Sequence, residues 1–356
     1  MAKSPRYGRI LHHIWQNRFV TKAILATLLL ADDKEGVHLR ISDNYKKSKD
    51  GVSLQTLSKA LQALWQNEYI EKWFIRDPLT SYETSEMEAY ALGAAGAEYL
   101  TRQTGLSIDE IKYPLKPDPG KPHKGSPISE QQTLRHHLLI SETIAALRLS
   151  CALSSKYKVV FSAPDKMIEV AYSLIAEGGA KQRFIRPDGF IVIKNLETGA
   201  YENFFIEADR STEKTSVFKN KLEAYFNLPQ EKHPKGKDYY ACLPELYDRF
   251  EIDRGEKRQL PWMRNLRVLT VCLTEMRAKN LAKIARSHFR GGSGSNMFQF
   301  TDISRISPIE KVLGQPLTLN QEKSSQAIEG EHWFSGLTSR DGYHSLFEID
   351  SLKTNS

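Results

Sequence analysis

Three carboxylates at the edges of two apolar segments are the residues whose types and spacing suggest chemistry. Asp188 precedes the apolar run 189–193, and Glu207 and Asp209 close the run 203–209. Side chains alternate along a strand, so Glu207 and Asp209 are expected on one face. Burying carboxylates in such apolar surroundings is costly unless they are neutralised, paired with a cation or left facing a polar cleft. This set of oxygen ligands suits a hard divalent cation, so Mg²⁺ or Mn²⁺ is the expected cofactor of an active site here.

A structural role is the alternative for the same residues. Asp188 lies in a Pro-Asp-Gly sequence, which is a common turn. Glu207 and Asp209 can instead be ion-pair partners of nearby arginines, namely Arg183, Arg186 and Arg210. We favour a cleft because these acids close a strand directly before a predicted helix.

The elements that must position these acids form an α/β pattern. Both acidic runs have strand length, and the polar connection between them predicts a β-hairpin or two neighbouring strands. A continuous apolar run at 266–273 predicts a buried strand. Helical patterns precede, separate and follow these strands, so a sheet covered by helices is expected. The predicted helices are 133–147, 212–226 and 276–288, and a last strand is predicted at 297–301.

The N-terminal third has the element order of a DNA-binding module. Leu54, Leu57, Leu61 and Leu64 recur at helical spacing, and the opposite face of that helix is polar and basic. A strand-like run at 68–76, a polar reversal and a return helix follow, which resembles a winged helix-turn-helix. A winged helix that binds protein or only dimerises is the alternative. The expected DNA-binding residues are Gln55, Thr56, Lys59 and Gln62 on the helix, with Lys72 and Arg76 on the ribbon.

Composition and length bound the class of protein. The 356 residues favour two domains with a tail, and 40% hydrophobic with 26% charged residues is ordinary for a globular chain. A net charge of +7 permits a polyanionic partner. Three distant cysteines, no apolar leader and no long apolar run favour a reduced cytoplasmic location without a membrane. The predicted parts are 1–112 (winged helix), 113–128 (Pro- and Lys-rich linker), 129–305 (α/β domain) and 306–356 (a partly loose extension).

The order of strands and acids resembles the PD-(D/E)xK nuclease-like core. In that family an Asp and a Glu bind Mg²⁺, and a Lys two residues after the Glu assists the attacking water. Asp188 and Glu207 match the acidic positions, but Asp209 stands at the Lys position. The resemblance implies a lysine moved to the following helix, with Lys221 and Lys214 as candidates. Glu142, in the preceding helix, resembles an additional acidic position of many members.

The full set of motifs resembles the replication-relaxation family of bacterial plasmids and mobile elements. The resemblance covers about Pro5 to Arg305 and is carried by RPDGFIVI, FFIEADRSTEKTSVFKNKLEAY and RVLTVCLTEMRAKNL. It implies an α+β chain with an N-terminal winged helix followed by a nuclease-like α/β domain. Its implied site contains Asp188, Glu207 and Asp209 as metal ligands, with Lys221 as the fourth catalytic residue. Arg210 and Tyr225 are further cleft candidates.

Two functions follow from this interpretation. The first is a DNA-binding protein acting in replication or relaxation of a mobile element, with Mg²⁺-dependent nicking by its nuclease-like domain. The second is a non-catalytic DNA-binding adaptor or transcriptional regulator, favoured by Asp209 in place of the lysine. The expected partners are double-stranded DNA, replication or transfer proteins of the element, and a second copy of the chain. Phosphate-loop spacing is absent from the sequence, which argues against an ATPase or helicase.

Overall fold

The computed structural model divides into two compact units. Unit 1 comprises Met1–Leu149 with Pro308–Gln321, and unit 2 comprises Ser150–Ser307 with Glu322–Ser356. Helices and mixed sheets occur together, which confirms the α+β class. The structure describes residues 5–32, 54–75, 87–109, 111, 127–164, 170–176, 179–210, 213–232, 238–249, 252, 265–289, 297–310, 318–319, 327–328, 333–335 and 346.

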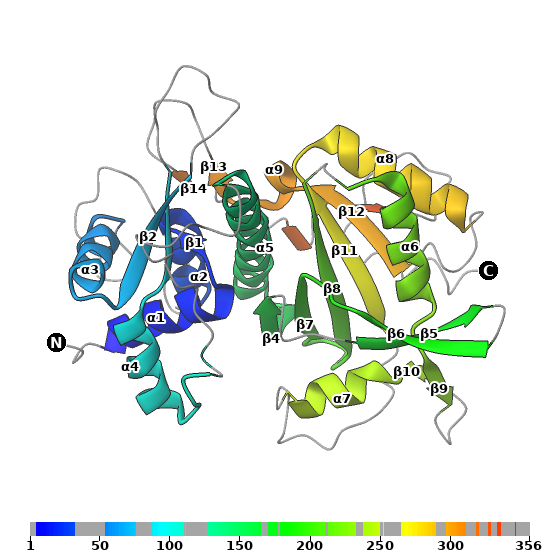
Figure 1. Cartoon of the computed structure of the whole chain (residues 1–356), viewed down its shortest axis with the longest axis horizontal. Coiled ribbons are helices and arrows are strands. Elements are labelled where there is room, and N and C mark those ends of the chain that lie inside the picture. The colour runs from blue at the N-terminus through cyan, green and yellow to red at the C-terminus, as the bar shows by residue number, and fades with distance from the viewer. Residues whose placement is uncertain are drawn as a thin grey trace. The chain divides into compact units, whose positions relative to one another are not determined.

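Unit 1 is built on a small antiparallel sheet with helices around it (Figure 1). The sheet has three strands in the order β1-β3-β2, and the β2–β3 pair forms a ribbon. The elements are α1 (Pro5–Asn17), β1 (Val20–Thr21), α2 (Lys22–Asp32), α3 (Leu54–Gln66), β2 (Ile70–Ile75), β3 (Met87–Leu92), α4 (Ala94–Thr104), most of α5 (Pro127–Leu153), β13 (Ile309–Glu310) and β14 (Thr318–Leu319).

One apolar core holds unit 1 together, and α3 contributes one side of itself to it. Leu57, Leu61 and Leu64 are buried, because residues three and four apart lie on one face of a helix. The start of α4 packs closely against the chain before β2. A Cβ on Gly96 would lie 2.1 Å from the carbonyl oxygen of Tyr69, so only glycine fits there.

Unit 2 is organised by a mixed sheet of six strands in the order β15-β12-β11-β8-β7-β4. The pairs β4–β7 and β7–β8 are antiparallel, whereas β8–β11 and β11–β12 are parallel. The elements are β4 (Tyr157–Pro164), β5 (Val170–Ala176), β6 (Gly179–Ile185), β7 (Gly189–Asn195), β8 (Tyr201–Asp209), α6 (Thr215–Phe226), β9 (Gln230–Lys232), β10 (Asp238–Tyr240), α7 (Cys242–Arg249), β11 (Leu266–Cys272), α8 (Glu275–His288), β12 (Phe298–Asp302), α9 (Ile303–Ile306) and β15 (Phe334–Ser335).

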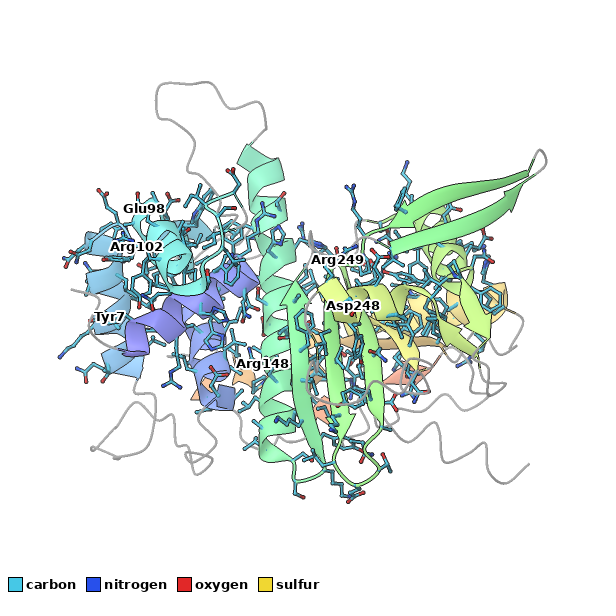
Figure 2. All side chains as sticks on the ribbon, turned by 90° about the horizontal axis from the view of Figure 1, so that it is seen from below. Tyr7, Glu98, Arg102, Arg148, Asp248 and Arg249 are labelled. Carbon is cyan, nitrogen blue, oxygen red and sulfur yellow. The ribbon has the colours of Figure 1, made fainter. Side chains whose placement is uncertain are left out.

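Helices α6 and α8 cover one face of this sheet (Figure 1). Phe205 of β8 and Val268 of β11 join Phe218 and Leu222 of α6 and Leu281 of α8 in one core. Because β8 and β11 are parallel, their carboxyl ends lie at the same edge of the sheet, and the helices that follow them begin there. This edge is where ligands bind in many α/β sheets. The β5–β6 ribbon extends away from the sheet (Figure 2).

The unit boundary lies within α5, since most of this helix groups with unit 1. From the sequence, that helix was predicted to belong to the domain 129–305. The predicted linker 113–128 lies outside the described residues except for its last two positions, which begin α5.

In the described part of the extension, Trp333 is buried and its indole nitrogen donates to the Ala327 carbonyl at 2.9 Å. Among the described helices, none is long and apolar enough to cross a membrane.

Candidate active site at the end of strand β8

The acidic residues predicted from the sequence meet where β7 begins and β8 ends. Gly189 pairs with Ile206, so the next position in the antiparallel register sets Asp188 opposite Glu207. The Asp188 carboxylate accepts a hydrogen bond from the backbone nitrogen of Ala208 at 2.9 Å. This bond ties the start of β7 to the end of β8 and keeps the two acids together.

Glu207 is buried and is held by two side chains of α6. Its Oε2 atom lies 2.8 Å from the Lys221 ammonium, and its Oε1 atom accepts a short hydrogen bond from the Tyr225 hydroxyl. Lys221 and Tyr225 are one helical turn apart, so both point towards the same strand. The structure therefore brings together Asp188, Glu207, Lys221 and Tyr225, all of which were named from the sequence.

The protonation state of this cluster is set by burial and by neighbouring charges. Burial and the Asp188 carboxylate raise the pKa of Glu207 to about 7, although Lys221 opposes this rise. Burial lowers the pKa of Lys221, but the carboxylates of Glu207, Asp188 and Glu213 outweigh it and raise that pKa well above its usual value. Burial and Glu207 also raise the pKa of Tyr225, so its hydroxyl stays protonated. Near neutral pH the cluster thus combines a cationic lysine with a glutamate close to its titration midpoint.

Asp209 lies on the same face of β8 but has a different partner. Arg277, near the start of α8, donates from Nε to one Asp209 oxygen at 3.1 Å and from Nη2 to the other at 2.8 Å. Such a bidentate pair uses both oxygens of the carboxylate. Arg277, which was not among the arginines named from the sequence, is therefore an ion-pair partner of Asp209.

Glu213 and Arg277 are site residues that the sequence analysis missed. Glu213 precedes α6, and its carboxylate lies 3.0 Å from the Lys221 ammonium. Arg277 also donates from Nη2 to the Glu213 carbonyl oxygen at 2.9 Å. The available signal for Glu213 was its place in the predicted helix 212–226, where it is eight residues, or about two turns, before Lys221.

The remaining candidates are Arg210, Lys214 and Glu142. Arg210 follows Asp209 directly and is partly buried, and Lys214 is exposed at the N-cap of α6. Glu142 is buried in the part of α5 that belongs to unit 1 and is described with that unit.

Asp188 and Glu207 are the two carboxylates of this site that could share a divalent cation. Among the described residues, no group of three or more His, Cys, Asp and Glu side chains is arranged to hold a metal ion. Mg²⁺ is commonly held by one or two carboxylates with water and substrate phosphates completing its shell. Asp188 lies opposite Glu207 in the strand register, and its carboxylate helps to raise the pKa of Glu207, a repulsion that a bound cation would relieve.

The polar side of α3 in unit 1 is exposed, as the sequence predicts. Gln55, Thr56, Lys59 and Gln62 are all exposed. The ammonium nitrogen of Lys72, on β2, lies 3.3 Å from Glu88 Oε1 and 3.4 Å from Gln62 Oε1. It also lies over the Trp65 ring, 4.5 Å from the ring centre. Arg76 lies outside the described residues.

Comparison with known proteins identifies the family. No curated protein and no solved structure matches the chain. Residues 11–240 match the family model described as replication-relaxation. The match runs from α1 through β10 and covers more than half of the 356 residues. It includes Asp188, Glu207, Lys221 and Tyr225. The chain therefore belongs to the replication-relaxation family, as the motifs predicted.

Proposed function

We propose that this protein binds DNA of a plasmid or other mobile element and cleaves it by metal-dependent hydrolysis during replication or relaxation. Membership of the replication-relaxation family suggests the role in replication. The observation that carries the cleavage proposal is the contact of Glu207 with Lys221 beside Asp188. Lys221, on α6, thereby takes the place of the lysine that the nuclease family has two residues after its glutamate.

The topology of unit 2 supports a nuclease-like core. A meander of three antiparallel strands, β4, β7 and β8, is followed by α6 and by β11 parallel to β8. The acids lie at the junction of β7 and β8, and the lysine on the helix that leaves β8. This is the arrangement that the resemblance to PD-(D/E)xK nucleases implies.

Asp188 and Glu207 would hold Mg²⁺ or Mn²⁺ in this mechanism. A bound cation supplies polarisation of the scissile phosphate and a lower pKa for a bound water. Glu207 must lose its proton to become a ligand, so metal binding should strengthen as the pH rises through about 7. Lys221 remains protonated and would stabilise negative charge on the phosphate, because its raised pKa disfavours a role as a base.

Unit 1 supports the DNA-binding half of the proposal. The order α1, β1, α2, α3, β2, β3 is that of a winged helix-turn-helix, with α3 in the recognition position. The buried leucines of α3 hold this helix in the core of unit 1. Its exposed face presents a lysine that can contact phosphates and glutamines that can contact base edges.

A non-catalytic adaptor is the second candidate function. Asp209 stands where the family lysine is expected, and Arg277 engages both of its oxygens. In this alternative, the carboxylate cluster only stabilises the fold and unit 2 mediates protein contacts.

Cleavage of supercoiled plasmid with Mg²⁺ or Mn²⁺ tests the proposal. We expect nicking by the wild type and its loss in Asp188→Ala and in Glu207→Ala. Glu197→Ala is the matched control, because Glu197 is an exposed acid in the β7–β8 turn. A binding assay on the same DNA runs in parallel. DNA binding by all four proteins without metal-dependent cleavage would support the adaptor instead.

A further inference from the structure

Lys221 is shared between two carboxylates. Its ammonium nitrogen lies 2.8 Å from Glu207 Oε2 and 3.0 Å from Glu213 Oε1. An ammonium has three donors, so it can serve both acceptors at once. The Glu207 side chain is 9% exposed and that of Glu213 is 21% exposed, so the inner acceptor is the more buried one.

Glu213 is itself fixed to the end of β8 through its backbone. Its carbonyl oxygen accepts from Arg277 Nη2 at 2.9 Å, and the same guanidinium binds both oxygens of Asp209. The chain between Asp209 and α6 is therefore anchored to α8 at both of its ends. This anchoring keeps the Glu213 side chain within reach of Lys221, about two helical turns along α6.

We propose that Glu213 is a positioning residue that retains Lys221 at the site when Glu207 turns its oxygens to a divalent cation. This inference rests on the proposed function, because it assumes that Glu207 is a metal ligand. Without Glu213, Glu207 is the one carboxylate among the described residues that pairs with Lys221, and the lysine and the cation compete directly for it. With Glu213, Lys221 keeps an ion pair and stays beside the reacting phosphate.

Mn²⁺ binding to the full-length protein at fixed pH tests this role without requiring cleavage. The variants are Glu213→Gln, Lys221→Met and the double variant, with Glu223→Gln as control because Glu223 is an exposed acid on α6. Glu213→Gln should weaken Mn²⁺ binding about fivefold in the wild-type background and less than about twofold in the Lys221→Met background. Lys221→Met alone should strengthen binding, and Glu223→Gln should leave it unchanged.

A simple effect of charge would behave differently. If Glu213 acts only by its negative charge, Glu213→Gln weakens binding equally in both backgrounds, and that result overturns the proposal. Glu213→Asp adds a second discriminator, since it keeps the charge but shortens the reach to Lys221. It should behave like Glu213→Gln; wild-type binding would contradict a positioning role.

The outcome also separates this inference from the function on which it rests. Absence of Mn²⁺ binding in the wild type overturns the metal-dependent function and the inference together. Wild-type binding that is lost in Asp188→Ala, combined with no coupling between Glu213 and Lys221, overturns the inference alone.

Discussion

The end of β8 in unit 2 and the outer face of α3 in unit 1 are both proposed to meet DNA, and they are built in opposite ways. At the end of β8, Glu207, Asp209 and Lys221 are each bound by other charged or hydroxyl side chains. On α3, exposed residues such as Lys59 lie on one face of the helix, and buried leucines on the opposite face pack it into the core of unit 1.

The difference determines how far the effect of a substitution should extend beyond the residue that is changed. Buried charges interact strongly and leave a costly unpaired partner when one member is removed. Exposed polar side chains on a helix contribute little to stability and act nearly independently. Substitutions at the end of β8 should therefore change stability and function together, whereas substitutions on α3 should change function alone.

The largest expected effect is on the Arg277–Asp209 pair. Arg277→Met leaves the buried Asp209 carboxylate without its bidentate partner, so we expect the free energy of unfolding to fall by about 3 kcal/mol in denaturant titrations. Arg249→Met is the control, because Arg249 (Figure 2) pairs with Glu245 on the surface of α7. Its loss should stay below about 1 kcal/mol. Equal losses would contradict the contrast between buried and exposed charges.

A compensating change sharpens this prediction. In the Arg277→Met background, Asp209→Asn removes a buried negative charge that has lost its bidentate partner, so part of the lost stability should return. Further destabilisation by the second change would mean that the Asp209 carboxylate has another stabilising partner.

The next effect is a pH dependence carried by Glu207. Its pKa is raised from 4.5 to about 7 in the folded protein, so the folded state binds more protons than the unfolded state between these values. The contribution is fully present below about 4.5, and the free energy of unfolding falls by up to about 3 kcal/mol as the pH rises through about 7. Glu207→Gln should remove this slope, and Glu197→Gln, on an exposed turn, should keep it. Denaturation measured across this range checks both, and an unchanged slope in Glu207→Gln would place the titration elsewhere.

Local pattern was sufficient for the residues close together in sequence. The apolar runs predicted β7 and β8, and helical spacing predicted which side of α3 is buried. Lys221 was named because the resemblance to PD-(D/E)xK nucleases implies a lysine on the helix after β8, and the structure sets it 2.8 Å from Glu207. The strands and the buried side of α3 follow from side-chain period, which a single sequence contains.

Pairing between distant segments was not predictable in the same way. Asp209 meets Arg277 because β8 and β11 are parallel with Cys272 opposite Asp209, which sets the start of α8 beside the end of β8. No periodicity in the sequence encodes that register. The assignment of α5 depends likewise on long-range packing, since the Ser141 hydroxyl lies 3.0 Å from the Asn17 carbonyl oxygen and 2.8 Å from that of Phe19 in unit 1.

The smallest expected effect is on the exposed face of α3. Lys59→Ala should weaken DNA binding by about 1 kcal/mol on every sequence and reduce the slope of log affinity against log salt by about 1, because a phosphate contact releases a counterion. Gln55→Ala, the neutral comparison on the same face, should alter sequence preference and leave the salt slope unchanged. Both variants should unfold within about 0.5 kcal/mol of the wild type, since neither side chain is buried. Binding titrations at several salt concentrations, together with denaturation, measure these quantities. A Lys59→Ala protein with the wild-type salt slope would remove α3 from the DNA interface, and a large loss of stability would show that this face is coupled to the fold as tightly as the end of β8.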